Sequence, residues 1–397
     1  MPGTLNQTPQ ANRLHIGIFG RRNAGKSSLI NALTGQRIAL ASEVPGTTTD
    51  PVYKAMEIQP IGPCVFIDTA GFDDEGELGG LRVQRTREAA ERTDVAVLVF
   101  CTEDVEPERE WVELFRGRKT PVVAVVNQAD LRDPEPVRRA VREAFGLEAL
   151  PVSAATGAGV SGIVEAIVCL LPEDYGAQSI VGHLVEPGDT VLLVMPQDIQ
   201  APKGRLILPQ VQTIRDLLDH GCVPVCVTTD RLEEALAALA QPPKLIITDS
   251  QVFATVYRRK PQESALTSFS VLFAGYKGDL KAYLSGAEAI DRLTEGSRVL
   301  IAEACTHKPL DGDIGRVKLP NLLRKRVGPG LRVEVVSGTD YPRDLGDYDL
   351  IIHCGGCMFN RRYVLSRIQR AQEQGVPITN YGVAIAKLAG ILDKVVY

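Results

Sequence analysis

The sequence contains few aromatic residues and no apolar run long enough to span a membrane. Phe, Trp and Tyr together make up 5% of the 397 residues. Apolar runs such as 95–101 and 122–126 are far shorter than the roughly 20 residues that a bilayer requires. The first dozen residues are polar and carry no apolar core of the signal-peptide type. We therefore expect a cytoplasmic chain that has no membrane contact.

Neither sign of charge dominates the sequence. Lys and Arg number 44 and Asp and Glu number 49, which gives a net charge of −5. This balance produces no field that attracts nucleic acid, so we expect no nucleic-acid partner. The basic clusters at 258–260 and 324–326 are interpreted as solvated surface. With 44% hydrophobic and 23% charged residues the composition is that of a globular protein, and the length predicts two or three domains.

The amino-terminal part of the chain predicts alternating strands and helices. Strands are expected at 14–19, 65–67, 95–100, 122–126 and 151–153, and a closing helix at 160–171. Most of these strands are continuous apolar runs, which are typical of strands buried on both faces of a parallel sheet. Residues 172–176 predict a linker.

Gly20 to Ser27 form the sharpest local motif, G-x-x-x-x-G-K-S, between an expected strand and an expected helix. Glycines let the backbone wrap closely around a phosphate, and the helix N-terminus adds partial positive charge. Lys26 is expected to bridge the β- and γ-phosphates of a nucleotide, and Ser27 to ligate Mg²⁺. The residues expected to contact nucleotide in this loop are Gly20, Asn23, Ala24, Gly25, Lys26, Ser27 and Ser28.

Four further segments indicate that the phosphate loop belongs to a GTPase. They are Asp68-Thr69-Ala70-Gly71, the loop 45–50 with Thr48, Asn127-Gln128-Ala129-Asp130, and Ser153-Ala154. Asp68 can reach Mg²⁺ through water, Thr48 is a second Mg²⁺ ligand, and the Gly71 amide can meet the γ-phosphate. Asp130 can accept from guanine N1–H and the exocyclic amine, which adenine does not offer. We therefore expect GTP as the nucleotide and Lys26, Thr48 and Gly71 as catalytic residues.

The order and strand-end placement of these five elements resemble the Ras-like GTPase superfamily over residues 14–172. Asn23 and the Pro-Gly-Thr-Thr loop are most similar to the branch of tRNA-modifying and ribosome-assembly GTPases. This resemblance implies a K⁺ ion bound through Asn23 beside the phosphates, where its charge stabilises the transition state. Gln128 replaces the usual Lys of the base-binding motif, which predicts weaker nucleotide binding with guanine choice retained. Phe72 stands where many signalling GTPases carry a water-orienting Gln, which predicts that hydrolysis is slow or depends on another group.

The remainder of the chain repeats the α/β pattern in shorter form. Strands are expected at 190–195, 223–228, 245–247, 298–302, 332–336 and 350–352, and helices at 209–219, 232–239, 280–293, 361–374 and 383–392. We divide the chain into domains 1–175, 176–269 and 270–397. The expected fold is α/β, with a P-loop GTPase domain followed by two smaller parallel-sheet α/β domains. The middle domain is expected to pack across a homodimer.

The last domain gathers cysteine and histidine residues after two expected strands. Cys305-Thr306-His307 follows strand 298–302, and His353-Cys354-Gly355-Gly356-Cys357 follows strand 350–352. Loops at the carboxyl ends of neighbouring parallel strands converge, so we expect the three thiolates to meet. Their chemistry fits a Cys₃His zinc site and a [4Fe–4S] cluster about equally, whereas a lone Cys-x-x-Cys redox pair leaves Cys305 idle. Four other cysteines are interpreted as small apolar fillers: Cys64, Cys101, Cys169 and Cys226.

The whole arrangement resembles the HydF family of [FeFe]-hydrogenase maturation GTPases, from Leu14 to Tyr397. The resemblance rests on a GTPase domain, a small middle domain and a terminal domain with Cys-x-His, 46 residues and Cys-x-x-Cys preceded by His. It implies a [4Fe–4S] cluster held by Cys305, Cys354 and Cys357, and it leaves open whether His307 or His353 ligates iron. It also implies a dimerising middle domain and the delivery of a di-iron precursor with CO and cyanide ligands to apo-[FeFe]-hydrogenase. Two radical-SAM maturases are the other implied partners.

Two other functions stay open at this point. An RNA-modification or ribosome-assembly GTPase with a zinc-stabilised carboxyl-terminal domain would need an RNA-binding surface. The second half of the chain has neither a basic excess nor interleaved aromatic residues. A regulatory GTP switch with structural cysteines is the other alternative.

Overall fold

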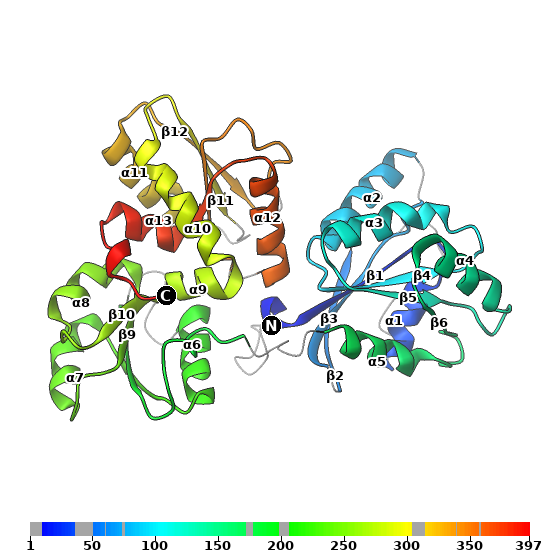
Figure 1. Ribbon diagram of the computed structural model, residues 1–397, viewed down its shortest axis with the longest axis horizontal. Helices are drawn as coiled ribbons and strands as arrows, with labels where there is room; N and C mark the ends of the chain where they lie inside the picture. Colours follow the sequence, from blue (N-terminus) through cyan, green and yellow to red (C-terminus); the bar gives the residue numbers. More distant parts are fainter. Residues whose placement is uncertain are drawn as a thin grey trace. The chain divides into compact units, whose positions relative to one another are not determined.

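The computed structural model of the chain consists of two compact units, Met1–Tyr175 (unit 1) and Gly176–Tyr397 (unit 2). The residues that the structure describes are 10–35, 51–59, 61–73, 76–171, 178–197, 206–303, 314–338, 340–356 and 359–397, with the backbone alone described at 10 and 76–78. Figure 1 shows that each unit consists of helices packed around its own strands.

Unit 1 is built on one six-stranded sheet in the order β2-β3-β1-β4-β5-β6. Its elements are β1 (Leu14–Gly20), α1 (Lys26–Thr34), β2 (Val52–Ile58), β3 (Gly62–Asp68), α2 (Gly76–Ala90), β4 (Val95–Phe100), α3 (Arg109–Gly117), β5 (Val122–Val126), α4 (Glu135–Phe145), β6 (Ala149–Pro151) and α5 (Val160–Leu170). All neighbouring strands pair in parallel except β2 with β3. The structure thus confirms the α/β class and the parallel sheet.

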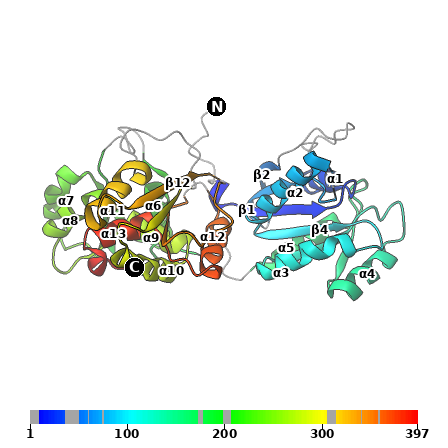
Figure 2. The ribbon, with the colours of Figure 1, turned by 90° about the horizontal axis from the view of Figure 1, so that it is seen from above.

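Helices cover both faces of this sheet. On one face, Leu29 of α1 and Ile163 of α5 join the core with residues of β1 and β4. On the other face, Trp111 and Phe115 of α3 and Val141 of α4 do the same. Figures 1 and 2 show β1 and β4 in the middle of unit 1 with helices on either side. Every residue of β1 and β4 is buried, which is why these strands are continuous apolar runs.

Two strands of unit 1 differ from the sequence prediction. β2 is an antiparallel edge strand of mixed exposure, and it has no continuous apolar run that would predict it. β6 is Ala149–Pro151, not 151–153. The Ser153 amide donates to the Ala158 carbonyl at 2.9 Å instead of to a neighbouring strand, so Ser153 lies in the turn after β6.

Unit 2 contains two four-stranded sheets, in the orders β10-β9-β7-β8 and β12-β11-β13-β14. Its elements are β7 (Thr190–Val194), α6 (Leu208–Asp219), β8 (Val223–Val227), α7 (Leu232–Ala238), β9 (Leu245–Thr248), α8 (Phe253–Arg259), β10 (Ala265–Ser268), α9 (Phe269–Lys277), α10 (Leu280–Ala287), β11 (Arg298–Glu303), α11 (Leu319–Val327), β12 (Arg332–Ser337), β13 (Leu350–His353), α12 (Arg361–Glu373), β14 (Ile378–Asn380) and α13 (Tyr381–Leu388). All strand pairs in both sheets are parallel, as the sequence predicts.

The carboxyl-terminal residues connect the two sheets of unit 2. Ile391 and Val395 pack in one buried cluster with Leu192 and Val194 of β7. The Val396 amide donates to the Leu266 carbonyl at 3.0 Å. Both sheets therefore belong to one compact unit, and the division of the chain at 269/270 stays a prediction.

No helix in the described part of the chain is long and apolar enough to cross a bilayer.

Two helices of unit 2 have different bounds from those that the sequence predicts. α10 ends at Ala287, and the chain continues as a 3₁₀ turn over Glu288–Arg292 instead of one helix to residue 293. α13 spans Tyr381–Leu388 instead of 383–392. It begins earlier because the Asn380 side chain accepts from the Val383 amide at 2.9 Å and caps the helix.

The cysteine residues differ in burial. Cys64 on β3 is fully buried, as the filler interpretation predicts, and Cys101 is half-buried. The interpretation is wrong for Cys169 and Cys226, which are exposed. Cys226 lies on β8, an edge strand with a neighbour on one side only, so an apolar run there does not imply burial.

We expect a thiol reagent at pH 8 to modify the exposed Cys169 in the folded chain and to leave Cys64 unmodified. Burial raises the pKa of the Cys64 thiol to about 11, so about one molecule in a thousand carries the reactive thiolate at pH 8. The thiolate fraction rises as the pH approaches 11. Brief alkylation followed by peptide mass mapping measures this pattern. Modification of Cys64 as fast as Cys169 would contradict it.

Candidate functional site

The phosphate loop connects the buried end of β1 to the first turn of α1. A Cβ atom at Gly20 would lie 2.6 Å from the Val99 carbonyl oxygen, and one at Gly25 would lie 2.3 Å from Asn127 Nδ2. Gly25 also has a φ of +86°, and Asn23 has a φ of 61°. Glycine and asparagine enter this left-handed region most readily. The residue types at these positions are therefore required by the loop's own geometry.

Lys26 lies within the phosphate loop. Its side chain is buried, and Nζ donates to the carbonyl oxygens of Gly20 at 3.0 Å and Arg21 at 2.8 Å. Both acceptors belong to the backbone of the loop itself. The ammonium group can therefore exchange these carbonyl partners for the oxygens of a bound phosphate without leaving the loop.

Ser27 and Asp68 bring a hydroxyl and a carboxylate together beside this loop. Ser27 Oγ donates to Asp68 Oδ2 at 2.7 Å, and Asp68 Oδ1 is buried without a hydrogen-bond partner among the described residues. Burial raises the pKa of Asp68, although the hydrogen bond from Ser27 and the charges of Lys26 and Lys54 act in the opposite direction. Mg²⁺ prefers oxygen ligands and keeps several waters, so an unpartnered carboxylate oxygen next to a hydroxyl fits a hydrated Mg²⁺ ion.

The segment after Asp68 is held on two sides. The Arg22 amide donates to Asp73 Oδ1 at 2.6 Å. A Cβ atom at Gly71 would lie 2.6 Å from the same amide nitrogen, so Gly71 passes very close to the phosphate loop. Phe72 stacks on Trp111, with ring centroids 5.3 Å apart. The Phe72 ring thus packs against α3, and it offers no group that could orient a water molecule.

Asn127 connects three segments on the expected base-binding side. It is buried; its Nδ2 donates to the Ala24 carbonyl at 2.9 Å, and its Oδ1 accepts from the Ala154 amide at 3.1 Å. Ser153 is buried as well, and its Oγ accepts from the Thr156 amide at 3.1 Å. These bonds fix the two loops that are expected to surround a nucleobase.

Gln128 and Asp130 follow Asn127 at the end of β5. Gln128 has a φ of 66°, and its Nε2 donates to the Asn23 carbonyl at 3.2 Å. The Gln128 side chain is thus attached to the phosphate loop. Asp130 is exposed, so its carboxylate is accessible to a ligand. Ser28 on α1 is exposed too.

A buried ion pair between Arg21 and Glu108, which the sequence did not predict, anchors the phosphate loop. Arg21 Nε donates to Glu108 Oε1 at 2.7 Å, and Arg21 Nη2 donates to Glu108 Oε2 at 2.9 Å and to the Asp104 carbonyl. The Glu108 side chain is 1% exposed. The partners are 87 residues apart in sequence, so no local motif could have indicated the pair.

Lys54 on β2 is a second residue that sequence reasoning missed. Its Nζ is buried without a hydrogen-bond partner among the described residues. Burial lowers the pKa of Lys54, and the charge of Asp68 acts in the opposite direction. A cation of the edge strand thus contributes to the electrostatics of the Asp68 carboxylate.

In unit 2, the carboxyl ends of β11 and β13 lie side by side. Ala302 is the register partner of His353, and the Cys354 amide donates to the Ala302 carbonyl at 3.0 Å. Cys354 itself is 7% exposed and packs with Phe359 and Tyr363. The strand that leads to Cys305 therefore ends next to Cys354.

His353 is fully buried, and both of its ring nitrogens have partners. Nδ1 lies 2.6 Å from the Cys354 carbonyl oxygen, and Nε2 lies 3.2 Å from Nη1 of Arg367. Because arginine only donates, Nε2 accepts and Nδ1 carries the proton. Burial and the Arg367 charge lower the pKa of His353 to about 3. In this arrangement the imidazole is neutral, and neither nitrogen is free for a metal.

Four expected site residues lie outside the part of the chain that the structure describes: Thr48, Cys305, His307 and Cys357. Within the described part, no group of three or more His, Cys, Asp or Glu residues is placed to hold a metal ion. Of the expected cluster ligands, this part contains Cys354.

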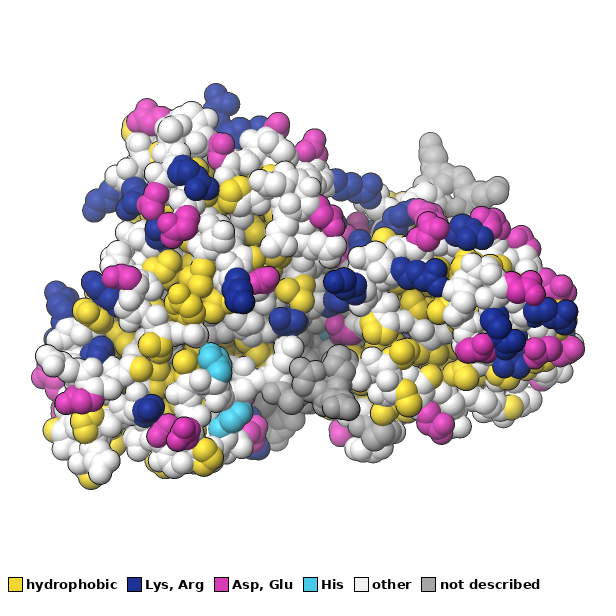
Figure 3. Space-filling model, viewed as in Figure 1, with side chains coloured by type: hydrophobic (Ala, Val, Ile, Leu, Met, Phe, Trp, Pro, Cys, Tyr) yellow, Lys and Arg dark blue, Asp and Glu magenta, His cyan; other side chains and the backbone are white. Residues whose placement is uncertain are grey.

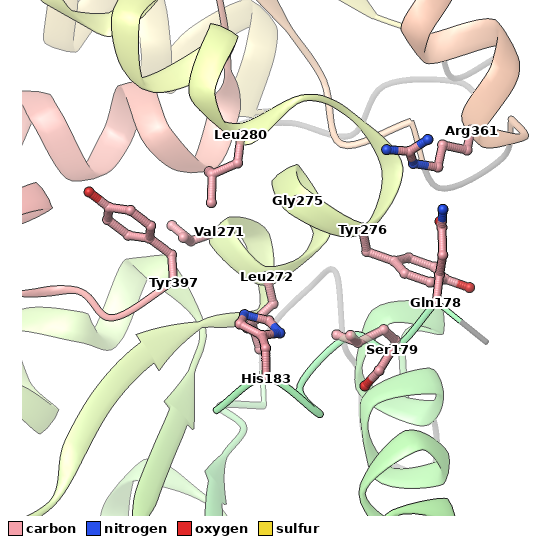
Figure 4. Close-up of a pocket in the computed structure, with 11 residues that line it drawn as sticks. Gln178, Ser179, His183, Val271, Leu272, Gly275, Tyr276, Leu280, Arg361 and Tyr397 are labelled. Atoms are coloured by element: carbon pink, nitrogen blue, oxygen red, sulfur yellow. The ribbon is translucent and has the colours of Figure 1, made fainter. Parts of the chain in front are cut away.

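A cavity of about 280 Å³ lies elsewhere in unit 2. Figure 4 shows Tyr276, Arg361 and Gln178 on one side of it and His183 and Tyr397 on the other. Burial raises the pKa of Tyr276. None of the residues expected in the nucleotide site or the cysteine site lines this cavity.

Charged side chains of both signs are interspersed on the face of each unit that Figure 3 shows.

The two units match different protein families. Residues 15–128 match the family of 50S ribosome-binding GTPases. Residues 180–278 match the hydrogen maturase F dimerization domain, and residues 281–397 match the hydrogen maturase F tetramerization domain. The chain belongs to the hydrogen maturase F (HydF) family. Unit 1 is the P-loop GTPase domain of this HydF chain, and unit 2 contains the segments that match the two hydrogen maturase F domains.

The HydF chain is also similar to other GTPases. tRNA modification GTPase MnmE of Heliobacterium modesticaldum is 30% identical over 226 residues, which cover 56% of this chain and 47% of that protein. GTPase Der of Wolinella succinogenes is 37% identical over 166 residues, which cover 39% and 35%. The crystal structure of Era in complex with MgGDPNP and 16S ribosomal RNA is 20% identical, with a TM-score of 0.36, and covers 58% of this chain and 98% of Era. The chain spans about half or less of the length of MnmE and Der.

We expect Glu108→Ala to destabilise unit 1 by about 3 kcal/mol, because it leaves the Arg21 cation without its buried partner. Loss of the pair should also loosen the phosphate loop and weaken GTP binding. Thermal unfolding and nucleotide titration measure the two effects.

Glu148→Ala is the matched control for this substitution. Glu148 binds Arg142 with the same two distances, 2.7 and 2.9 Å, but on the exposed surface. Exposed pairs contribute little, so stability and GTP binding should stay near those of the unmodified chain. Equal effects of the two substitutions would contradict a special role of the buried pair.

Proposed function

We propose that this chain is a GTP-hydrolysing carrier in [FeFe]-hydrogenase maturation, which holds a [4Fe–4S] cluster and delivers a di-iron precursor to apo-[FeFe]-hydrogenase. One observation carries the proposal: a phosphate loop in unit 1 accompanies hydrogen maturase F domains in unit 2, where Cys354 follows a strand that pairs with β11. Two radical-SAM maturases are the other proposed partners. The domains named for dimerization and tetramerization support a homodimer that can assemble further.

In unit 1 the phosphate loop and the loops next to it bind GTP and stabilise charge during its hydrolysis to GDP and phosphate. Lys26 leaves the carbonyl oxygens of its own loop for the β- and γ-phosphates, and the Gly71 amide donates to the γ-phosphate. Thr48 completes the site from the loop 45–50. On the base side, Asp130 accepts from guanine, while Asn127, Ser153 and Ala154 hold the surrounding loops.

Mg²⁺ and K⁺ are the proposed ions of this site. Ser27 and Thr48 ligate Mg²⁺ directly, and Asp68 holds it through water with its otherwise unpartnered oxygen. When bound, Mg²⁺ neutralises charge on the β- and γ-phosphate oxygens. Asn23 holds K⁺ beside the phosphates. Phe72 cannot orient the attacking water, so the site depends on charge stabilisation by these ions.

In unit 2, Cys305, Cys354 and Cys357 hold the [4Fe–4S] cluster. Cys305 follows Ala302 by three residues, and Cys357 follows Cys354 by three. Three residues span at most about 11 Å, and the Cys354 amide is bonded to the Ala302 carbonyl. Chain length therefore permits the three thiolates to meet. Three thiolates leave one iron for an exchangeable ligand, which suits a carrier whose cargo arrives and leaves.

We expect GTP hydrolysis to be faster in K⁺ than in Na⁺ at equal ionic strength, and we expect Asn23→Ala to lose the difference. The physical reason is that K⁺ supplies the transition-state charge that no Gln or Arg supplies. Steady-state phosphate release measures the rates. Asn31→Ala on α1 is the control and should keep the K⁺ effect. Equal rates of the unmodified chain in both salts would contradict the proposal for K⁺ and leave the GTPase itself standing.

We expect anaerobic reconstitution with iron and sulfide to give a brown protein, and Cys305→Ala, Cys354→Ala and Cys357→Ala each to lose most of the iron and absorbance. The thiolates are the ligands that an iron–sulfur cluster requires. Iron and sulfide assays and the visible spectrum measure this. Cys226→Ala removes an exposed cysteine of β8 and should retain the cluster. A colourless protein with one zinc per chain would contradict the cluster and favour a zinc-stabilised GTPase.

A further inference from the structure

Arg367 is the most deeply buried Lys or Arg among the described residues of unit 2. It lies on α12 and is 1% exposed. Its guanidinium carbon lies 4.7 Å from the ring centroid of Tyr341 and 4.6 Å from that of Tyr363. The two tyrosine rings thus enclose the cation, and the π faces of such rings attract positive charge.

The other partners of Arg367 are all uncharged. It donates to the Gly338 carbonyl, to the Tyr363 hydroxyl at 2.7 Å and to His353 Nε2 at 3.2 Å. Its Nε has no hydrogen-bond partner among the described residues. Within this part of the chain no carboxylate forms an ion pair with it either. Burying a charge without a counter-charge is costly, so an unpaired buried guanidinium indicates that an anion belongs nearby.

Arg367 is connected to the cysteine loop through one residue. It donates to His353 Nε2, and Nδ1 of the same ring donates to the Cys354 carbonyl. Arg367 does not contact a thiolate in the described contacts, so it would act on the cysteine site through His353 and through its electric field. A field of this kind is strong in a dry interior, where little solvent screens it.

The proposed cluster supplies the negative charge that the surroundings of Arg367 lack. Three thiolates around a [4Fe–4S] core in its +2 state leave a net charge of about −1, and one-electron reduction makes it about −2. A fixed cation nearby favours the more negative state and hence raises the reduction potential. Outer residues that donate to the ligand loop tune metal centres in this way.

We propose that Arg367 is the buried counter-charge of the cysteine site, which acts through His353 on an anionic metal cluster held at Cys354. This inference rests on the proposed function, because it requires that the cluster binds. Arg367 is thus a positioning residue: it fixes the neutral His353 against the Cys354 carbonyl and supplies the charge that lets the cluster accept an electron.

The experiment compares four substitutions in the full chain after anaerobic reconstitution. Arg367→Met and Arg367→Gln remove the charge, and Gln keeps hydrogen-bonding capacity if Met prevents folding. Arg367→Lys keeps the charge. Arg370→Gln is the matched control, because Arg370 also lies over the Tyr341 ring, at 5.6 Å, but is not buried. Circular dichroism identifies the variants that fold, and a redox titration followed by electron paramagnetic resonance measures the potential, the added dithionite supplying the electron.

We expect the neutral variants to shift the reduction equilibrium at least tenfold toward the oxidised cluster, which corresponds to about 59 mV for one electron. Arg367→Lys should remain close to the unmodified chain, and Arg370→Gln should change little. Equal shifts in Arg367→Lys and the neutral variants would make the role purely structural and overturn the proposal, as would no shift in any of them. If the unmodified chain takes up no cluster at all, the proposed function fails and the inference about Arg367 fails with it. A cluster that binds with an unshifted potential defeats the inference alone.

Discussion

Parallel strand pairing is the constraint on which both candidate sites depend. In a parallel sheet all strands end at the same edge, so loops that are distant in sequence meet there. In unit 1 this edge gathers the phosphate loop after β1, the Asp68 segment after β3 and the Asn127 segment after β5. In unit 2 the same rule brings the end of β11 to the start of the cysteine loop after β13. Both units thus place chemistry on loops and use the sheet as the rigid support.

The sequence predicts most strands because their burial is reflected in composition. The bounds of β4 and β5 agree with the predicted strands 95–100 and 122–126 residue for residue, since both strands lie inside the sheet. The strands that the sequence did not predict, β2, β10 and β14, all lie at the edge of a sheet. β2 has no continuous apolar run, and β8 has an apolar sequence but an exposed Cys226, because an edge strand has a neighbour on one side only. Propensity alone does not encode which strand lies at an edge.

At the candidate sites, too, local motifs are predictable from the sequence and long-range contacts are not. Gly20, Gly25 and Lys26 belong to a local motif, so sequence spacing alone predicts a phosphate loop there. The partners of Arg21 and Arg367 lie on other elements, and their significance depends on burial that no spacing reveals. The two arginines also differ in their surroundings. Arg21 has Glu108 as a buried counter-charge, and this pair links the phosphate loop to the residue directly before α3. Arg367 has aromatic rings and neutral acceptors, an environment that holds a cation in place without neutralising it.

The GTPase unit alone does not select one function, because it is similar both to tRNA modification GTPase MnmE and to GTPase Der. The distinction lies in unit 2. A structural zinc requires four protein ligands, and three thiolates supply three. His353 cannot supply the fourth in the described arrangement, since the Cys354 carbonyl and the Arg367 guanidinium engage its two nitrogens. A zinc site would then depend on His307 alone, whereas a [4Fe–4S] cluster is held by three thiolates and needs no histidine. The contacts of His353 therefore leave His307 as the histidine on which a zinc site would depend, whereas the proposed cluster depends on neither histidine.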